Sequence, residues 1–285
     1  MRLSSDWAAL TVALALALAG LIGIASPASA APNGELRVCA DPNNLPFSNN
    51  TDAGFENKLA SMVAEALGRS VSYTWWAQRR GFVRNTLKSD KCDVVMGVPA
   101  GYELVETTKP YYRSTYVFVS RQDEHLDLSS LLDPRLHRLT IGVHLVGDDG
   151  NNPPPAQALG QLGIVDNVRG YPIYGDYRQA DPPARLIEAV ERGEIDVAAA
   201  WGPLGGYFAA HSKVPLSVAP IRDGERFAPQ QFQFAISMGV RKGDHALRDQ
   251  LNAFIDAHRS DIAALLRSYG VPLFDERVSA SGGHE

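Results

Sequence analysis

Apolar residues in the first half of the chain recur with periods that alternate between strand and helix. Residues 36–40 form a short apolar strand that a polar turn at 41–44 ends. Apolar positions at 54–68 have helical spacing, and Gly68 suits the C-terminal end of such a helix. The segments that follow are a β-branched and aromatic strand at 71–76, a helix at 81–89 and an apolar strand at 93–98. The pattern predicts a β-α-β-α-β unit.

The same order of elements returns in the second half of the chain. Its segments are strands at 139–144, 168–174 and 195–201 and helices at 155–162 and 183–192. The closing segments of the two units align residue for residue, 87–94 against 190–197. Alternating strands and helices predict parallel neighbours joined by right-handed crossovers. We therefore expect an α/β protein with two parallel-type sheets, one in each of two lobes.

Two long extended segments predict the connections between these lobes. Residues 111–120 follow the first unit and residues 231–240 follow the second, and both are rich in aromatic and β-branched residues. We interpret them as a pair of hinge strands. A helical tail at 244–269 is expected to pack back on the first lobe. The expected division is lobe 1 at 31–118 and 238–276, lobe 2 at 119–237, and a flexible tail at 277–285.

The first thirty residues have the pattern of a secretory signal peptide. Arg2 precedes an apolar run at 7–24, and Ala28 and Ala30 supply the small residues that signal peptidase requires. The alternative is a single membrane anchor, for which this run is marginal in length. Cleavage after Ala30 leaves 285 − 30 = 255 residues, enough for two modest lobes. We expect a periplasmic protein with no membrane span after cleavage.

Composition and motifs exclude several classes of function. The net charge of −5 argues against a nucleic-acid surface. No nucleophile elbow, phosphate loop or zinc-protease motif occurs in the sequence. A binding protein without a catalytic site or cofactor is therefore favoured. Ligands of open parallel sheets bind at the carboxyl ends of the strands, so we expect the site in the cleft between the two lobes.

Several strings along the chain resemble a known family. Residues 54–57 (GFEN), 92–97 (CDVVMG) and 110–112 (PYY) are similar to the type II periplasmic solute-binding proteins. More narrowly, residues 37–48 and 78–82 (QRRGF) resemble the subgroup associated with quinoprotein dehydrogenases, including methanol dehydrogenase. The resemblance implies a two-lobed type II fold, and a quinoprotein alcohol dehydrogenase as the partner.

The sequence departs from the amino-acid binders of that family at two positions. Those relatives carry an Arg before the Pro-Tyr-Tyr string, where this chain has Leu104. They also carry an Asp after the last strand of lobe 2, where this chain has Trp201-Gly202-Pro203. Both charged anchors for a free amino acid are thus missing, which favours a segment of the dehydrogenase as the occupant of the cleft. The alternatives are a small-molecule-binding component of an ABC importer and a dehydratase-type enzyme.

Residues near the strand ends are the candidates for the cleft, and each also has an ordinary structural explanation. The candidates are Asp41, Asn43, Asn44, Phe47, Trp75, Trp76, Arg79, Arg80, Tyr112, Arg113, His144 and Trp201. Asp and Asn are common in turns, and one of two adjacent tryptophans belongs in the core. The adjacent arginines suit either a solvated face or carboxylate recognition.

Acidic residues supply two further alternatives. His144 with Asp148 and Asp149 could ligate a metal, but the spacing is unspecific and we expect none. Glu56, Glu103 and Glu106 are the acids or bases that an enzyme of this fold would use.

Cys39 and Cys92 are the two cysteines of the chain. Export would place them where disulfides persist. In the usual strand order of the fold that the chain resembles, their strands are neighbours, and a bridge requires Cα atoms within about 7 Å. A disulfide is therefore favoured over two buried thiols.

Overall fold

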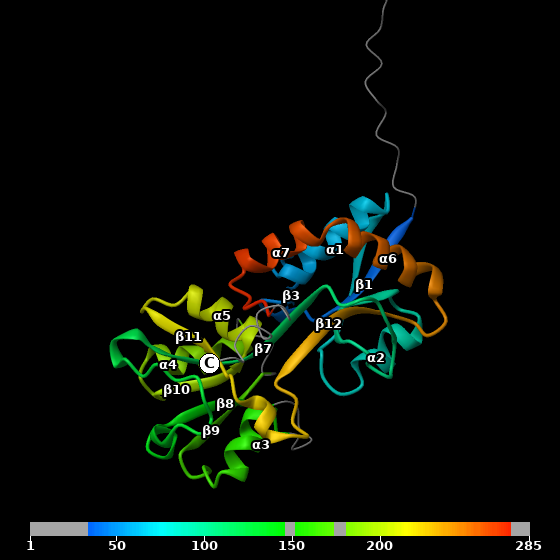
Figure 1. Cartoon of the computed structure of the whole chain (residues 1–285). Coiled ribbons are helices and arrows are strands. Elements are labelled where there is room, and N and C mark those ends of the chain that lie inside the picture. The colour runs from blue at the N-terminus through cyan, green and yellow to red at the C-terminus, as the bar shows by residue number, and fades with distance from the viewer. Residues whose placement is uncertain (1–33, 146–151, 174–180, 275–285) are drawn as a thin grey trace, which may run out of the picture. The chain divides into compact units, whose positions relative to one another are not determined.

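The computed structural model describes residues 34–145, 152–173 and 181–274, all within one unit of the chain, Asn33–Glu285. The expected signal peptide at 1–30 and the expected tail at 277–285 lie outside the described residues. Ten of the strands join in the order β4-β1-β5-β12-β7-β10-β8-β9, with β11 beside β7 and β6 beside β12. The chain has the expected two-lobed α/β architecture (Figure 1).

The first lobe is built on three parallel strands. β1 (Glu35–Ala40) lies between β4 (Ser70–Trp75) and β5 (Val94–Pro99). Three helices pack together on this sheet: α1 (Phe55–Ala66), α6 (His245–Ala257) and α7 (Arg259–Ser268) (Figure 1). The expected tail helix therefore returns to the first lobe, although it divides into two at His258.

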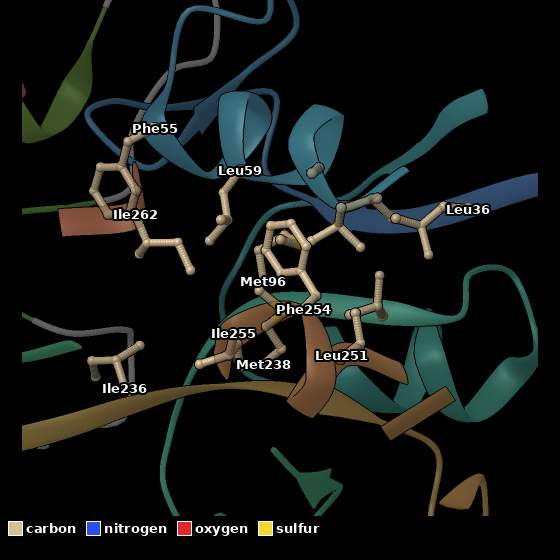
Figure 2. Packing of buried hydrophobic residues seen from close by; sticks show 14 of the residues in the cluster. Leu36, Phe55, Leu59, Met96, Ile236, Met238, Leu251, Phe254, Ile255 and Ile262 are labelled. Atoms are coloured by element: carbon tan, nitrogen blue, oxygen red, sulfur yellow. The ribbon is translucent and has the colours of Figure 1, made fainter. Parts of the chain in front are cut away.

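Apolar side chains from helices and sheet meet in the core of this lobe. Figure 2 shows Leu59 of α1, Met96 of β5 and Phe254 of α6 directed toward one another. All three are at most 4 % exposed. The helical spacing of apolar residues in α1 and α6 thus reflects burial of one face against the sheet.

The first lobe also contains several short elements. The expected helix at 81–89 is a single turn, α2 (Phe82–Asn85), followed by a 3₁₀ turn, η1 (Leu87–Ser89). Thr86 interrupts it with φ −118° and ψ −84°. The remaining short strands are β2 (Asn43–Asn44), β3 (Ser48–Asn49) and β6 (Glu106–Thr107).

The second lobe repeats the parallel core. β8 (Ile141–Leu145) lies between β9 (Val168–Pro172) and β10 (Val197–Trp201). Its helices are α3 (Pro154–Gln161), α4 (Arg185–Glu191) and α5 (Gly202–Ala210). α5 begins at Gly202 with Pro203 in its first turn, where the missing N–H of proline costs nothing. The unexpected strand β11 (Leu216–Pro220) pairs antiparallel with β7.

The two expected hinge strands are present and pair with each other. β7 (Tyr112–Arg121) runs antiparallel to β12 (Gln233–Val240) over Tyr112–Thr115, and antiparallel to β10 from Tyr116 onward. β12 continues antiparallel along β5. The two parallel-type sheets expected from the sequence are therefore joined into one mixed ten-stranded sheet, because antiparallel β7 and β12 connect the two parallel cores.

The favoured disulfide is present. Cys39 in β1 and Cys92 before β5 are bonded, with Cα atoms 5.5 Å apart. β1 and β5 are adjacent parallel strands, as the expected strand order required. Both cysteines are buried among Phe82, Val83 and Leu87. The bridge therefore anchors the α2 segment to the sheet as well as joining two strands.

None of the helices within 34–145, 152–173 and 181–274 combines the length and apolar character needed to cross a bilayer.

Candidate functional site

A cavity of about 770 Å³ opens at the carboxyl ends of the strands. Segments that follow β1, β4, β5 and β10 all contribute to it, as the rule for open α/β sheets predicts. The two crossing strands β7 and β12 contribute the residues between the lobes. Its principal lining residues are Asn44, Phe47, Glu56, Gln78, Arg79, Arg80, Arg84, Lys88, Tyr102, Leu104, Tyr112, Tyr116, Ile173, Trp201, Leu204 and Phe234.

The structure brings six of the twelve candidate residues to this cavity: Asn44, Phe47, Arg79, Arg80, Tyr112 and Trp201. The other six lie outside its lining: Asp41, Asn43, Trp75, Trp76, Arg113 and His144. One of the latter, Asp41, acts on the cavity indirectly.

Asp41 positions the loop that carries Arg79. Its side chain is fully buried and accepts hydrogen bonds from the backbone N–H of Asn43 at 2.9 Å and of Gln78 at 2.7 Å. Asn44 supports the same loop, because its side-chain amide donates to Gln78 Oε1 at 3.3 Å. The turn after β1 thus fixes the loop after β4.

Asn43 contacts the second lobe. Its Oδ1 accepts a hydrogen bond at 3.2 Å from the backbone N–H of Asp181, which precedes α4. Desolvation is the main cause that raises the pKa of the Asp181 carboxyl.

The two adjacent tryptophans take different positions, both away from the cavity lining. Trp75 stacks on Tyr73 with ring centroids 4.5 Å apart and packs against the first-lobe core. Trp76 is 39 % exposed, and Lys91 Nζ lies 5.2 Å from its ring centroid. Trp75 therefore packs against the core, and Trp76 lies on the surface.

Arg113 and His144 also lie away from the lining. Arg113 is exposed on β7, and its carbonyl accepts from Phe274 N–H. His144 is 4 % exposed, and its Nε2 lies 3.1 Å from the Pro183 carbonyl oxygen. Burial lowers the pKa of His144 to about 4, so the imidazole is neutral at pH 7. The metal alternative also needs Asp148 and Asp149, which lie outside the described residues.

Aromatic rings form one end of the cavity. Trp201, the residue before α5, makes edge contacts with Tyr116 at 5.4 Å and Phe234 at 5.6 Å between centroids. Phe47 packs edge-on to the buried Phe55 at 5.4 Å. Phe234 on the second crossing strand was not among the candidates, although aromatic residues marked that strand in the sequence. We call Phe47, Tyr112, Tyr116, Trp201 and Phe234 the aromatic end.

Glu56 is the one carboxyl group among the described lining residues. It lies in the first turn of α1, is 7 % exposed, and its side chain occupies the space beside Gly97. A Cβ at residue 97 would lie 2.2 Å from Glu56 Oε1, so the glycine leaves room for this position of the Glu56 side chain. Desolvation raises the pKa of Glu56 to about 8. At pH 7 the group is therefore mainly a neutral hydrogen-bonding acid.

Basic side chains form another part of the lining. Arg79, Arg80, Arg84 and Lys88, which we call the basic wall, come from the loop after β4 and from α2 and η1. Arg84 and Lys88 were not among the candidates. Their signal in the sequence is the four-residue spacing of Arg80, Arg84 and Lys88, which puts them on one face of a helix.

The residues at the two departures from amino-acid binders lie at the cavity. Leu104 lines it and is 43 % exposed. Trp201 lines it at the start of α5. Glu106 bonds to His245 and Arg248, and neither Glu106 nor Glu103 is among the lining residues.

Comparison with known proteins identifies the family. The model of the family described as "Bacterial extracellular solute-binding proteins, family 3" matches residues 36–272, and the chain belongs to this family. Protein MoxJ of Methylorubrum extorquens is 35 % identical over 295 residues, covering 93 % of this chain and 95 % of that protein.

Two solved structures are similar over the whole of their chains. The periplasmic binding protein XoxJ from Methylobacterium extorquens AM1 has a TM-score of 0.70 and 38 % identity, covering 85 % of this chain and 100 % of that one. MxaJ from Methlophaga aminisulfidivorans MPT has a TM-score of 0.71 and 27 % identity, covering 84 % and 100 %. The resemblance to the type II fold and its methanol dehydrogenase-associated subgroup is confirmed.

Proposed function

We propose that this chain is a periplasmic accessory protein of a quinoprotein (methanol) dehydrogenase system, and that it holds a segment of the dehydrogenase in its interlobe cavity. The composition of the cavity carries the proposal. The aromatic end and the arginines match the residue types that dominate protein–protein binding energy. Neither Leu104 nor Trp201 can form the ion pairs that a free amino acid requires.

The proposal includes no reaction. Within the part of the chain that the structure describes, the cavity lining contains Glu56 as its single carboxyl and no His, Cys, Ser or Thr. The lining therefore lacks the Ser, Cys or Thr nucleophile paired with a His base that covalent catalysis commonly uses. The family description and the printed name of XoxJ as a periplasmic binding protein support a binding role without catalysis and a periplasmic location.

A small-molecule ligand is the second candidate. A volume of about 770 Å³ lies within the range of small-molecule pockets, about 300–1,000 Å³. Such a ligand would be captured for an importer or delivered to the dehydrogenase.

Binding of the chain after Ala30 to purified apo and holo methanol dehydrogenase by interferometry tests the proposal. Trp201→Ala, and separately Arg79→Ala with Arg80→Ala, should each weaken binding by at least about 1 kcal/mol if these residues are anchors. Trp76→Ala is the matched control, because it removes an exposed tryptophan outside the cavity lining. We expect this control to bind like the wild type.

Absence of binding to either form of the dehydrogenase, together with tight binding of a small metabolite, would replace this proposal with ordinary solute capture. Equal losses for Trp76→Ala and Trp201→Ala would show that the cavity is not the contact.

A further inference from the structure

The charge of the cavity is opposite to that of the chain. The whole sequence has a net charge of −5, whereas the described lining contains the four cations of the basic wall and one carboxyl, Glu56. Glu56 is mainly protonated at neutral pH, so it offsets little of this positive charge. Like charges such as Arg79, Arg84 and Lys88 in one wall repel one another unless an anion lies among them.

Some arginines elsewhere on this protein form ion pairs. Seven of them lie within 3 Å of a carboxylate oxygen: Arg37, Arg121, Arg135, Arg192, Arg241, Arg248 and Arg259. The side chains of Arg79, Arg84 and Lys88 have no such partner among the residues that the structure describes. These three side chains are therefore available to an anionic partner.

The basic wall is held on a fixed support. Phe82, Val83 and Leu87 lie between its members in sequence and are at most 6 % exposed, packed around the Cys39–Cys92 disulfide. Gln78, directly before Arg79, is fixed by the buried Asp41 carboxylate. Charged groups held in place before binding lose less entropy when a partner arrives.

Exposure indicates how an occupant would lie. All four side chains of the basic wall are exposed, whereas Tyr112 is 7 % exposed and Trp201 is half-buried. An occupant that reaches both regions must therefore be apolar at its inner end and anionic where it meets solvent. A peptide segment that projects from a folded partner has this arrangement.

We propose that the occupant is an acidic segment of the partner protein, with carboxylates on the basic wall and an apolar or aromatic side chain at the aromatic end. This inference rests on the proposed function and specifies the chemistry of the segment. Arginine pairs with carboxylates in a bidentate geometry, and the resulting complementarity also accelerates association at low salt.

Charge reversal tests the proposal. Arg84→Glu with Lys88→Glu should weaken binding to methanol dehydrogenase at least about 20-fold at about 20 mM salt, mainly through slower association. It should also remove most of the difference in affinity between about 20 mM and about 300 mM salt. Both side chains are exposed and lack partners among the described residues, so thermal unfolding should change little.

The matched control is Lys242→Glu with Arg267→Glu. It changes the net charge by the same amount at two exposed positions outside the cavity lining. We expect less than about threefold loss, because long-range effects of net charge are screened at distances beyond about 10 Å. Equal losses for the two double variants would overturn the proposal.

Two further outcomes separate this inference from the proposed function. No binding of the wild type to the dehydrogenase refutes the proposed function itself. Strong wild-type binding that neither double variant alters refutes only the acidic segment. Citrate, a small tricarboxylate, is the probe for a free anion, and calorimetric binding tighter than about 10 µM would show that the cavity takes a small molecule instead.

Discussion

Glu56 shows how one residue is constrained by its surroundings. Its carboxyl lies in the first turn of α1, where the helix dipole favours a negative charge. The same group is 7 % exposed and lies against Gly97, which disfavours that charge. Desolvation dominates and raises the pKa to about 8.

This pKa predicts how stability depends on pH. The ordinary value of 4.5 applies in the unfolded chain, so between pH 4.5 and about 8 the folded state binds more protons than the unfolded state. The contribution of Glu56 is fully present below pH 4.5 and is lost as pH rises through about 8. Each unit of pKa difference corresponds to about 1.4 kcal/mol. Glu56→Gln should therefore flatten the fall in stability on the alkaline side, as measured by urea unfolding from pH 5 to pH 9.

Glu65→Gln is the control for this measurement, because Glu65 is exposed on the same helix. It should keep the pH dependence of the wild type. Identical slopes for wild type and Glu56→Gln would mean that the Glu56 carboxyl is ionised in the folded protein at neutral pH.

At the scale of single residues, sequence reasoning found the loops of the cavity better than their side chains. Asn44, Phe47 and Arg79 follow strand ends and line the cavity. The choice between Trp75 and Trp76 could not be made, because adjacent strand residues face opposite sides and sequence does not say which side is covered. His144 lies near the end of β8, close to where the sequence pattern predicted, but its ring is directed toward the Pro183 carbonyl.

Among the elements, the pair β1 and β5 bears the disulfide. The bridge closes a loop of 53 residues and lies beside α2. In the chain-entropy account, a cross-link of this separation stabilises a protein by about 4 kcal/mol.

Reduction should therefore lower the unfolding temperature and destabilise the α2 segment first. Cys39→Ala with Cys92→Ala should have the same effect as reductant on the wild type, and reductant should have no effect on that variant. Intact mass after alkylation without reductant checks the bond directly. Two alkylated thiols in the untreated protein would contradict it.

Elements with strong periodicity were predictable from sequence, and those shaped by tertiary contacts were not. α1 and β5 have clear patterns and lie where expected. α5 contains Gly205 and Gly206, which have low helix propensity. A Cβ at residue 206 would lie 2.0 Å from the Gly270 carbonyl oxygen, so the glycine permits the close approach of the C-terminal segment. Sequence periodicity contains no information on such a contact between distant segments.

At the scale of the described fold, β7 and β12 determine where the cavity lies. β7 pairs with β10 of the second lobe and with β12, and β12 continues along β5 of the first lobe. Tyr112, Tyr116 and Phe234 on these strands therefore line the cavity. The repeat in the sequence indicated two lobes and a cleft, whereas the antiparallel direction of the crossing strands followed from no local pattern.

The two missing anchors lead to a prediction about ligands for the fold as a whole. Leu104 and Trp201 line the cavity, and the family resemblance implies an arginine and an aspartate at these places in the amino-acid binders. A zwitterion brought into this cavity would lose hydration at both charges and regain no matched pair there. Glu56 does not replace the aspartate, since it is mainly protonated at pH 7.

A thermal-shift and calorimetric screen of the common amino acids should therefore find no binding tighter than about 1 µM, which corresponds to about 8 kcal/mol. The wild type with and without reductant serves as the internal control, because loss of the Cys39–Cys92 bond should give a clear shift in the same assay. The basic wall could still attract acidic amino acids weakly, so aspartate and glutamate are the sharpest members of the screen. One amino acid that binds stoichiometrically below this limit would show that the cavity contains anchors other than the two that are missing, and would favour solute capture over a protein segment.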